Sequence, residues 1–220
     1  MTTLLNFDED LFTIEPAEWR INNVLPAEGI TLLTGDISSG KSFLALDLAA
    51  SVASGSDWHG NKVKQAGVVY LTSDSHHHLG RRMAAWKQAH GDIGAFYATK
   101  DQVLPEAYAD LDLPPDTRLV VLDQLFAATP EVVAAIAALR KRYNCAVLIV
   151  HADVAWDKEC IAAVETFSAM SAARIRVSDD NGMMDLVLEP RETAPHKLRL
   201  QRVVVDIGED TTSCILKRPT

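Results

Sequence analysis

Near the start of the chain, eight consecutive residues fit the pattern G-x-x-x-x-G-K-[ST] of a loop that binds phosphate. In such a loop the glycines let backbone N–H groups wrap a phosphate, and the helix that follows adds positive potential. We expect Lys41 to reach the β- and γ-phosphates of a nucleotide and the Ser42 hydroxyl to ligate Mg²⁺. The predicted nucleotide-binding residues are Gly35, Asp36, Ile37, Ser38, Ser39, Gly40, Lys41, Ser42 and Phe43.

The segments on both sides of this loop are those that its chemistry needs. Residues 29–34 form a short apolar run that predicts a buried strand. Residues 43–50 combine helix formers with apolar residues at helical spacing. The alternative is a chance match of the pattern in a helix-capping loop. The correct flanks favour phosphate binding.

Three other predicted strands end in side chains that can do chemistry, namely Asp74, Asp123 and His151. In an open parallel sheet, ligands bind outside the carboxyl ends of the strands. We therefore expect these three side chains to gather beside the loop of residues 35–42. Their convergence is more specific than any one of them alone.

Each of these side chains has a functional and a structural interpretation. Asp123 follows four apolar residues like a Walker B acid, which holds the coordination shell of Mg²⁺, or it caps the next turn. Asp74 is placed to orient or deprotonate an attacking water, or it is an exposed loop acid. His151 is placed to sense a γ-phosphate through a ring nitrogen, or it is a strand-end histidine with ordinary hydrogen bonds.

A run of three histidines, residues 76–78, invites a metal-site interpretation. Adjacent residues cannot all face one ion without a contorted backbone, and no spaced set of His, Cys or Glu partners accompanies them. We interpret the run as a solvated helix start or as a surface near the nucleotide.

Predicted strands alternate with predicted helices over the first three quarters of the chain, which indicates a parallel sheet with right-handed crossovers. Farther on, residues 173–177 and 184–188 flank Asn181-Gly182, a strong hairpin signal. Residues 198–207 and 213–216 are predicted as two further strands. The expected fold class is therefore α/β, with a mainly parallel central sheet flanked by helices and an antiparallel C-terminal extension.

A length of 220 residues suits one α/β domain of good size. We place this domain at residues 29–220, with the antiparallel extension at about 173–220. Residues 1–28 are predicted to form a leader that packs on the core, or that helps to bind a base or a neighbouring subunit.

Composition and charge narrow the classes of partner. A formal net charge of −9 argues against nucleic-acid binding by the whole surface, although a local basic patch stays open. Three widely spaced cysteines, Cys145, Cys160 and Cys214, favour a reduced cytoplasmic environment over a disulfide framework or a zinc site. No apolar run approaches the roughly 20 residues that span a bilayer, and residues 1–10 lack the pattern of a signal peptide. We therefore predict a cytoplasmic protein without membrane contact.

An ordered set of motifs resembles the RecA-like P-loop ATPases, and more closely the RepA-type branch found in plasmid replicative helicases and phage proteins. The resemblance covers residues 20–155 well and the C-terminal strands more loosely. The motifs that carry it are Ser38-Ser39-Gly40-Lys41-Ser42 with Phe43 to Ala49, Trp58-His59-Gly60, Gly67 to Leu71, Arg81-Arg82 with Ala85-Trp86, Leu119 to Asp123, and Val147 to His151.

This resemblance implies a RecA-like fold, ATP and Mg²⁺ as cofactors, and a homo-oligomeric ring or filament in which a neighbour's basic side chain completes each site. It also implies hydrolysis that drives motion on single-stranded DNA, in DNA replication or recombination. By position, Lys41 and Ser42 match the Walker A residues and Asp123 the Walker B acid. Asp74 falls where such proteins carry a catalytic glutamate, and His151 falls where they carry a polar sensor.

Several positions depart from the pattern of such ATPases. Asp74 is one methylene shorter than glutamate, so its carboxylate is expected about 1 Å short of the ideal position, a displacement that costs on the order of 100-fold in rate. Ala152 replaces a second histidine. The loops after Asp123 and His151 are poor in cations, which predicts a weak grip on DNA because phosphate contacts supply most nonspecific affinity.

The basic motif that would act in the site of a neighbouring subunit is also incomplete. Related proteins carry a Lys-x-Arg pair on a late strand, and Glu189-Pro190-Arg191 keeps only the arginine. Arg191 is the candidate catalytic residue for this role; the alternative is a surface charge that pairs with Glu192.

Three functions follow as hypotheses. The first is an ATP-hydrolysing motor or assembly ATPase of the RepA or hexameric-helicase type. The second is a nucleotide-dependent oligomeric regulatory or interaction protein with weak hydrolysis and little DNA binding, which Asp74, Ala152 and the cation-poor loops favour. The third is a small-molecule P-loop kinase, for which Arg81 and Arg82 would supply cations, but the β-rich last quarter is unlike a mobile lid.

Overall fold

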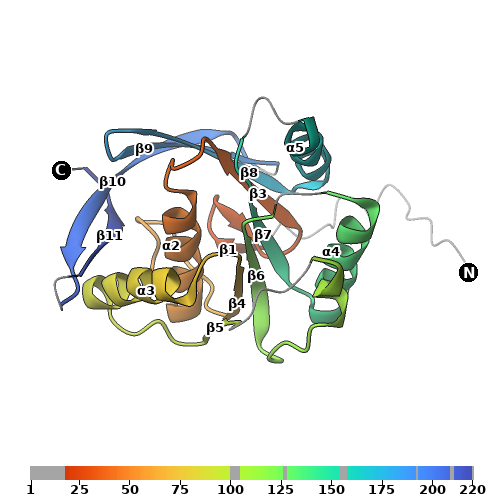
Figure 1. Cartoon of the computed structure of the whole chain (residues 1–220), viewed down its shortest axis with the longest axis horizontal. Helices are drawn as coiled ribbons and strands as arrows, with labels where there is room; N and C mark the ends of the chain where they lie inside the picture. The colour runs from red at the N-terminus through yellow and green to blue at the C-terminus, as the bar shows by residue number, and fades with distance from the viewer. Residues whose placement is uncertain are drawn as a thin grey trace, which may run out of the picture.

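Nine strands form one sheet within the residues that the structure describes, which are 18–99, 105–125, 128–153, 158–191, 193–208 and 211–219 (Figure 1). The structure is a computed structural model. In the order of the sheet, the strands are β11 (Thr212–Lys217), β10 (His196–Asp206), β9 (Met183–Pro190), β8 (Ala173–Asp180), β3 (Ile30–Gly35), β7 (Ala146–Val150), β6 (Thr117–Asp123), β4 (Gly67–Thr72) and β5 (Phe96–Ala98).

The sheet has a parallel part and an antiparallel part. From β8 through β3, β7, β6 and β4 to β5, each strand runs parallel to its neighbour. Beyond β8, the strands β9, β10 and β11 pair antiparallel. The predicted α/β class, a mainly parallel sheet with an antiparallel extension, is therefore confirmed. The central strands β3, β6 and β7 are almost wholly buried, as expected of parallel strands covered on both faces.

The predicted hairpin lies between β8 and β9. Its turn residues, Asn181 and Gly182, have φ angles of 51° and 85°, the left-handed conformation that a tight two-residue hairpin turn requires. Both strands are longer than predicted because the pairing continues up to the turn, where Asp180 lies opposite Met183.

Helices cover both faces of the sheet (Figure 1). The helices α2 (Lys41–Ser54) and α3 (His76–His90) pack into one core cluster, which also takes the inward side chains of β8 to β11. On the other face, α4 (Pro130–Tyr143), α5 (Lys158–Met170) and the short 3₁₀ helix η1 (Pro105–Asp110) pack into a second cluster. The two clusters hold the carboxyl ends of the parallel strands in fixed positions between them.

The helix α3 begins three residues earlier than residues 79–89 predict. The Ser75 hydroxyl accepts a hydrogen bond from the backbone N–H of His78, which caps the first turn. Residues 76–78 therefore form that turn and are exposed, as the interpretation of a solvated helix start expects.

Part of the predicted leader lies within the described residues. There β1 (Trp19–Ile21) pairs antiparallel with β2 (Leu25–Pro26), and the side chains of Ile21 and Leu25 are fully buried in the cluster around α2. Residues 1–17 lie outside the described residues, so the boundary of the leader stays a prediction. In the part of the chain that the structure covers, every helix is too short or too polar to cross a bilayer.

Candidate functional site

The glycine-rich loop joins the end of β3 to the start of α2. Gly35 has a φ of 152°, and a Cβ placed on it would lie 2.2 Å from the carbonyl oxygen of Val177 in β8, so only glycine fits there. Gly40 has a φ of 86° and is the residue before the first turn of α2. The loop is thus held against β8 on one side and opens at the helix N-terminus, where phosphate binds in such loops.

Lys41 points into this loop. Its Nζ donates hydrogen bonds to the carbonyl oxygens of Gly35 (2.9 Å) and Asp36 (2.6 Å), and the residue is only 3% exposed. Burial lowers the pKa of the Lys41 ammonium, and the nearby carboxylates of Asp153, Asp123 and Asp36 counteract this effect. The predicted phosphate-binding cation therefore already lies in the concavity of the loop.

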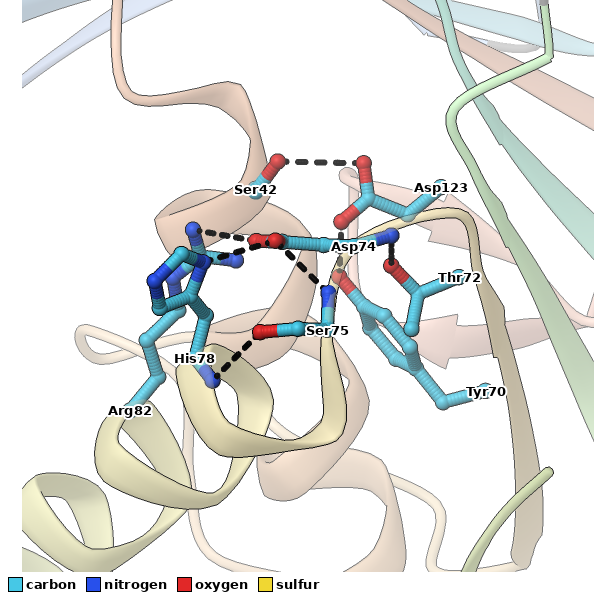
Figure 2. Close-up of polar contacts among 8 residues, drawn as sticks. All are labelled: Ser42, Tyr70, Thr72, Asp74, Ser75, His78, Arg82 and Asp123. Carbon is cyan, nitrogen blue, oxygen red and sulfur yellow. Dashed lines mark hydrogen bonds and ion pairs between the residues drawn. The ribbon is translucent and has the colours of Figure 1, made fainter. Parts of the chain in front are cut away.

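Ser42 and Asp123 meet beside Lys41. The Ser42 hydroxyl donates to Oδ1 of Asp123 at 3.0 Å, and the Tyr70 hydroxyl donates to Oδ2 at 2.7 Å (Figure 2). Burial raises the pKa of the Asp123 carboxyl, although hydrogen bonds from Tyr70 and Ser42 oppose the shift. Serine and carboxylate oxygens suit Mg²⁺, and two of its ligands at a right angle stand about 3.0 Å apart. The residues present therefore fit this metal.

Asp74 lies in the connection between β4 and α3, close to this pair (Figure 2). Its Oδ1 accepts from the backbone N–H of Ser75 and lies 2.8 Å from Nδ1 of His78, while its Oδ2 accepts from Arg82 at 3.0 Å. Partial burial would raise the pKa of Asp74, but these hydrogen bonds and the Arg82 charge hold it below its ordinary value. Asp74 is thus an ionised carboxylate with both oxygens engaged, which differs from a free loop acid.

His151 follows β7 and is fully buried. Its Nδ1 lies 2.6 Å from the carbonyl oxygen of Leu125, so Nδ1 carries a proton and donates it. In the neutral ring, Nε2 then carries the lone pair, and within the described residues this atom has no hydrogen-bond partner. The next residue but one, Asp153, donates its backbone N–H to Gly35 O at 3.0 Å, so the segment from residue 151 to 153 lines the back of the loop.

Arg191 does not join these residues. It follows Pro190, which pairs with Ala173 at the start of β8, whereas the glycine loop lies at the other end, where Gly35 pairs with Val177. Its side chain is exposed and donates to the carbonyl oxygen of Ala169. Arg191 therefore lies near the end of the sheet at which the parallel strands begin. The phosphate loop of its own chain lies at the other end, where these strands finish.

Three residues near the loop were not predicted as site residues. Tyr70 is fully buried in β4 and orients Asp123, as described above. Arg82 of α3 places its guanidinium 5.0 Å from the centre of the Phe43 ring while it pairs with Asp74. Arg202 of β10 forms an ion pair with Asp179, in which Nη2 of Arg202 lies 2.7 Å from Oδ2 of Asp179.

A cavity of about 360 Å³ lies in front of the loop. Arg82 and Arg202 both line it, so the concavity contains two guanidinium groups in addition to the Lys41 ammonium. The residues that line it are Ile37, Ser38, Gly40, Lys41, Ser42, Phe43, Arg82, Gln124 and Arg202. Such a concentration of positive charge suits a ligand with several phosphates.

Many solved structures share the fold of this chain, and two of them are compared with it. The flagellar accessory protein FlaH from Methanocaldococcus jannaschii is 9% identical, with a TM-score of 0.53 over 79% of this chain and 84% of that one. A KaiC-like protein, PH0186, from Pyrococcus horikoshii OT3 is 14% identical, with a TM-score of 0.50 over 90% of this chain and 99% of that one. At these identities the likeness concerns the fold, which is that of RecA-like nucleoside triphosphatases.

Sequence comparison gives the family. None of the curated protein sequences matches the chain significantly. A family model described as an AAA domain matches residues 1–152, which is more than half of the chain and includes the glycine loop, Asp74, Asp123 and His151. The chain therefore belongs to the AAA domain family of P-loop ATPases and has a RecA-like fold.

Proposed function

We propose that the chain binds ATP together with Mg²⁺ and hydrolyses it. One observation supports this proposal above the others: Lys41 points into a glycine loop at a helix N-terminus, and Ser42 lies 3.0 Å from a buried carboxylate, Asp123. When bound there, Mg²⁺ would neutralise charge on the β- and γ-phosphates. Lys41 would hold the same phosphates, while Ser42 and Asp123 would hold the metal.

The direct test is phosphate release from ATP with Mg²⁺ and with a chelator in its place. We expect release only with Mg²⁺, and we expect Ser42→Ala to abolish it because the metal loses a ligand. Ser56→Ala is the matched control, since Ser56 lies exposed in the turn after α2. Equal release by Ser42→Ala and the wild type would contradict the proposal.

We expect turnover by the chain alone to be slow. A carboxylate that deprotonates or orients a water needs a free lone pair to accept its hydrogen bond. Oδ1 of Asp74 faces both the Ser75 N–H and Nδ1 of His78, so only Oδ2, which already accepts from Arg82, has a lone pair left. Arg82 also lines the phosphate cavity, so a nucleotide phosphate can attract its guanidinium away from Asp74. Release of Asp74 would then depend on the nucleotide.

The RepA-type assignment and the oligomer belong to the proposal as well. Arg191 is exposed at the end of the sheet opposite its own phosphate loop, which suits a side chain that acts in the site of a neighbour in a ring or filament. Arg191→Ala and Lys41→Ala should each be inactive, and a mixture should recover part of the activity because one mixed interface has both residues. No recovery on mixing would remove this role of Arg191.

DNA binding is the part of the proposal with the least support. The described residues of the loops after Asp123 and His151 are Gln124, Leu125, Ala128, Thr129, Ala152 and Asp153, and none of these is a cation. If the chain is a motor in DNA replication or recombination, single-stranded DNA should stimulate phosphate release at low salt. Absence of both stimulation and binding at low salt would contradict the motor.

A second candidate is a nucleotide-dependent oligomeric regulator with weak hydrolysis. The engaged carboxylate of Asp74 is the observation that favours it. Its mass in solution should then rise when ATP and Mg²⁺ are added, with little phosphate released. A mass that stays that of one chain in both conditions would exclude this candidate.

A further inference from the structure

A second cavity of about 330 Å³ lies next to the phosphate cavity. Phe43 and Arg82 line both cavities, and the Arg82 guanidinium lies over the Phe43 ring, so the two cavities adjoin at this pair. The remaining walls of the second cavity come from the start of α3 and from β10 and β11. A nucleotide whose phosphates lie at Lys41 would therefore have its nucleoside end near this second space.

The strand β10 connects the two cavities. Arg202 lines the phosphate cavity and Val204 lines the second one. Residues two apart on a strand project from the same face, so one face of β10 forms a continuous wall of both spaces. Val204 is 68% exposed, and its partner across the strand pair is Cys214 of β11. An apolar side chain thus stands open to solvent at the place where a ligand would continue past the phosphates.

The lining of the second cavity suits a flat ring. The Arg82 guanidinium is planar and lies over the Phe43 ring, and guanidinium planes and aromatic faces both stack on bases. Val204 offers an aliphatic surface, and Thr212, which projects from the same face of β11 as Cys214, adds a hydroxyl group at the rim. A hydroxyl both donates and accepts hydrogen bonds, so it can pair with the amino group of adenine as well as with the carbonyl oxygen of guanine.

We propose that this cavity binds the purine base of the nucleotide, by stacking between the Arg82–Phe43 pair and Val204. Because the Thr212 hydroxyl serves either edge, the site accepts adenine and guanine nucleotides with affinities within about tenfold of each other. This inference rests on the proposed binding of a nucleoside triphosphate at Lys41.

Cys214 provides a probe inside the cavity. Its thiol is free and partly exposed, whereas Cys145 is buried and burial raises the pKa of its thiol to about 11. N-ethylmaleimide should therefore label Cys214 faster than Cys145, and mass spectrometry locates the label on each of the three cysteines. We expect ATP and GTP, each with Mg²⁺, to slow labelling of Cys214 at least tenfold. Inorganic triphosphate fills only the phosphate cavity and should leave the rate unchanged.

The converse experiment uses the adduct itself. Prior labelling of Cys214 should weaken ATP binding at least tenfold and leave binding of inorganic triphosphate as it was. In Cys214→Ser, treatment with the reagent should leave ATP binding unchanged, which excludes effects of label elsewhere.

The outcomes separate this inference from the proposed function. If ATP binds in a Lys41-dependent way but does not protect Cys214, or if inorganic triphosphate protects it equally well, the base site is wrong and nucleotide binding stands. If the affinities for ATP and GTP differ more than about tenfold in either direction, the tolerance for both purines is wrong. If neither ATP nor triphosphate binds, the proposed function fails and the base site fails with it.

Discussion

The two carboxylates of the site lie in opposite environments. Asp123 ends a central strand, is 3% exposed, and is fixed by hydroxyl groups of Ser42 and Tyr70, and burial raises the pKa of its carboxyl. Asp74 lies in a connection between a strand and a helix, is about one-third exposed, and is held by side chains of α3, with a lowered pKa. The part of the site proposed to bind the metal is therefore preformed, whereas the part proposed to activate water depends on contacts that can exchange.

The largest effect should come from Asp123→Asn. The loss of a charged Mg²⁺ ligand should lower Mg²⁺-dependent phosphate release by about 1,000-fold or more, since a metal contributes several kcal/mol at the transition state. Phosphate release over a series of Mg²⁺ concentrations measures this effect.

The same substitution should leave the protein as stable as before or more stable. Burial raises the pKa of Asp123 above its unfolded value. The ionised form therefore costs folding free energy once the pH exceeds the unfolded pKa, and the full cost is present above the folded pKa. An amide removes the charge and with it the pH dependence. Thermal unfolding at pH 7 measures the change in stability. A clearly lower Tm for Asp123→Asn would show that the ionised carboxylate does not cost folding free energy.

Asp74→Asn should act on hydrolysis alone. An amide does not accept a proton, so kcat should fall by about 100-fold or more, while ATP affinity stays within about threefold because Asp74 does not hold the metal. Single-turnover hydrolysis together with equilibrium binding separates the two quantities. Unchanged hydrolysis would show that another residue activates the attacking water. Asp74 would then be an exposed loop acid without a catalytic role.

Tyr70→Phe tests how rigid the metal side is. Removal of the hydroxyl leaves Oδ2 of the buried Asp123 without its donor at 2.7 Å, which should destabilise the fold by about 1–3 kcal/mol. The Mg²⁺ concentration needed for half-maximal activity should rise several-fold because the carboxylate is less well oriented. Urea unfolding and a Mg²⁺ titration measure the two effects, and a neutral result in both would show that Tyr70 does not orient Asp123.

The smallest effect should come from His78→Ala, which removes one of the contacts that hold Asp74. Turnover should rise about two- to threefold because Oδ1 then keeps only the hydrogen bond from the Ser75 N–H and has a lone pair left for water. The free energy of unfolding should change by less than about 0.5 kcal/mol because the pair is partly exposed. His77→Ala, at the exposed neighbouring position, is the control. A fall in turnover would show that His78 supports Asp74.

The convergence of the glycine loop, Asp123 and His151 could be predicted from the sequence, for a physical reason. Residues 35–43 are contiguous, so their chemistry follows from local backbone geometry, and Asp123 and His151 follow apolar runs whose carboxyl ends meet at one edge of the sheet. The alternation of strands and helices predicted the parallel sheet, and Asn181-Gly182 predicted the hairpin.

Two of the contacts near the site could not be predicted, because they depend on the order of the strands in the sheet, which the sequence does not reveal. Tyr70 reaches Asp123 because β4 pairs with β6, and Arg202 reaches the phosphate cavity because the antiparallel extension continues on the β8 side of β3. The partners of Asp74 are different in kind, because Ser75, His78 and Arg82 all lie within eight residues of it in the sequence. Their contacts follow from where α3 begins, at residue 76 and not at residue 79 as predicted.

We propose that Lys41 and the glycine loop form a nucleotide site before any ligand arrives. Titration calorimetry of ATP with Mg²⁺ tests it most directly, on the wild type, on Lys41→Ala and on Lys62→Ala, in which an exposed lysine paired with Asp57 is removed as a control. We predict one ATP per chain for the wild type and for Lys62→Ala, and an affinity at least about 100-fold weaker for Lys41→Ala. Equal affinities in all three proteins, or no binding by the wild type, would contradict the account.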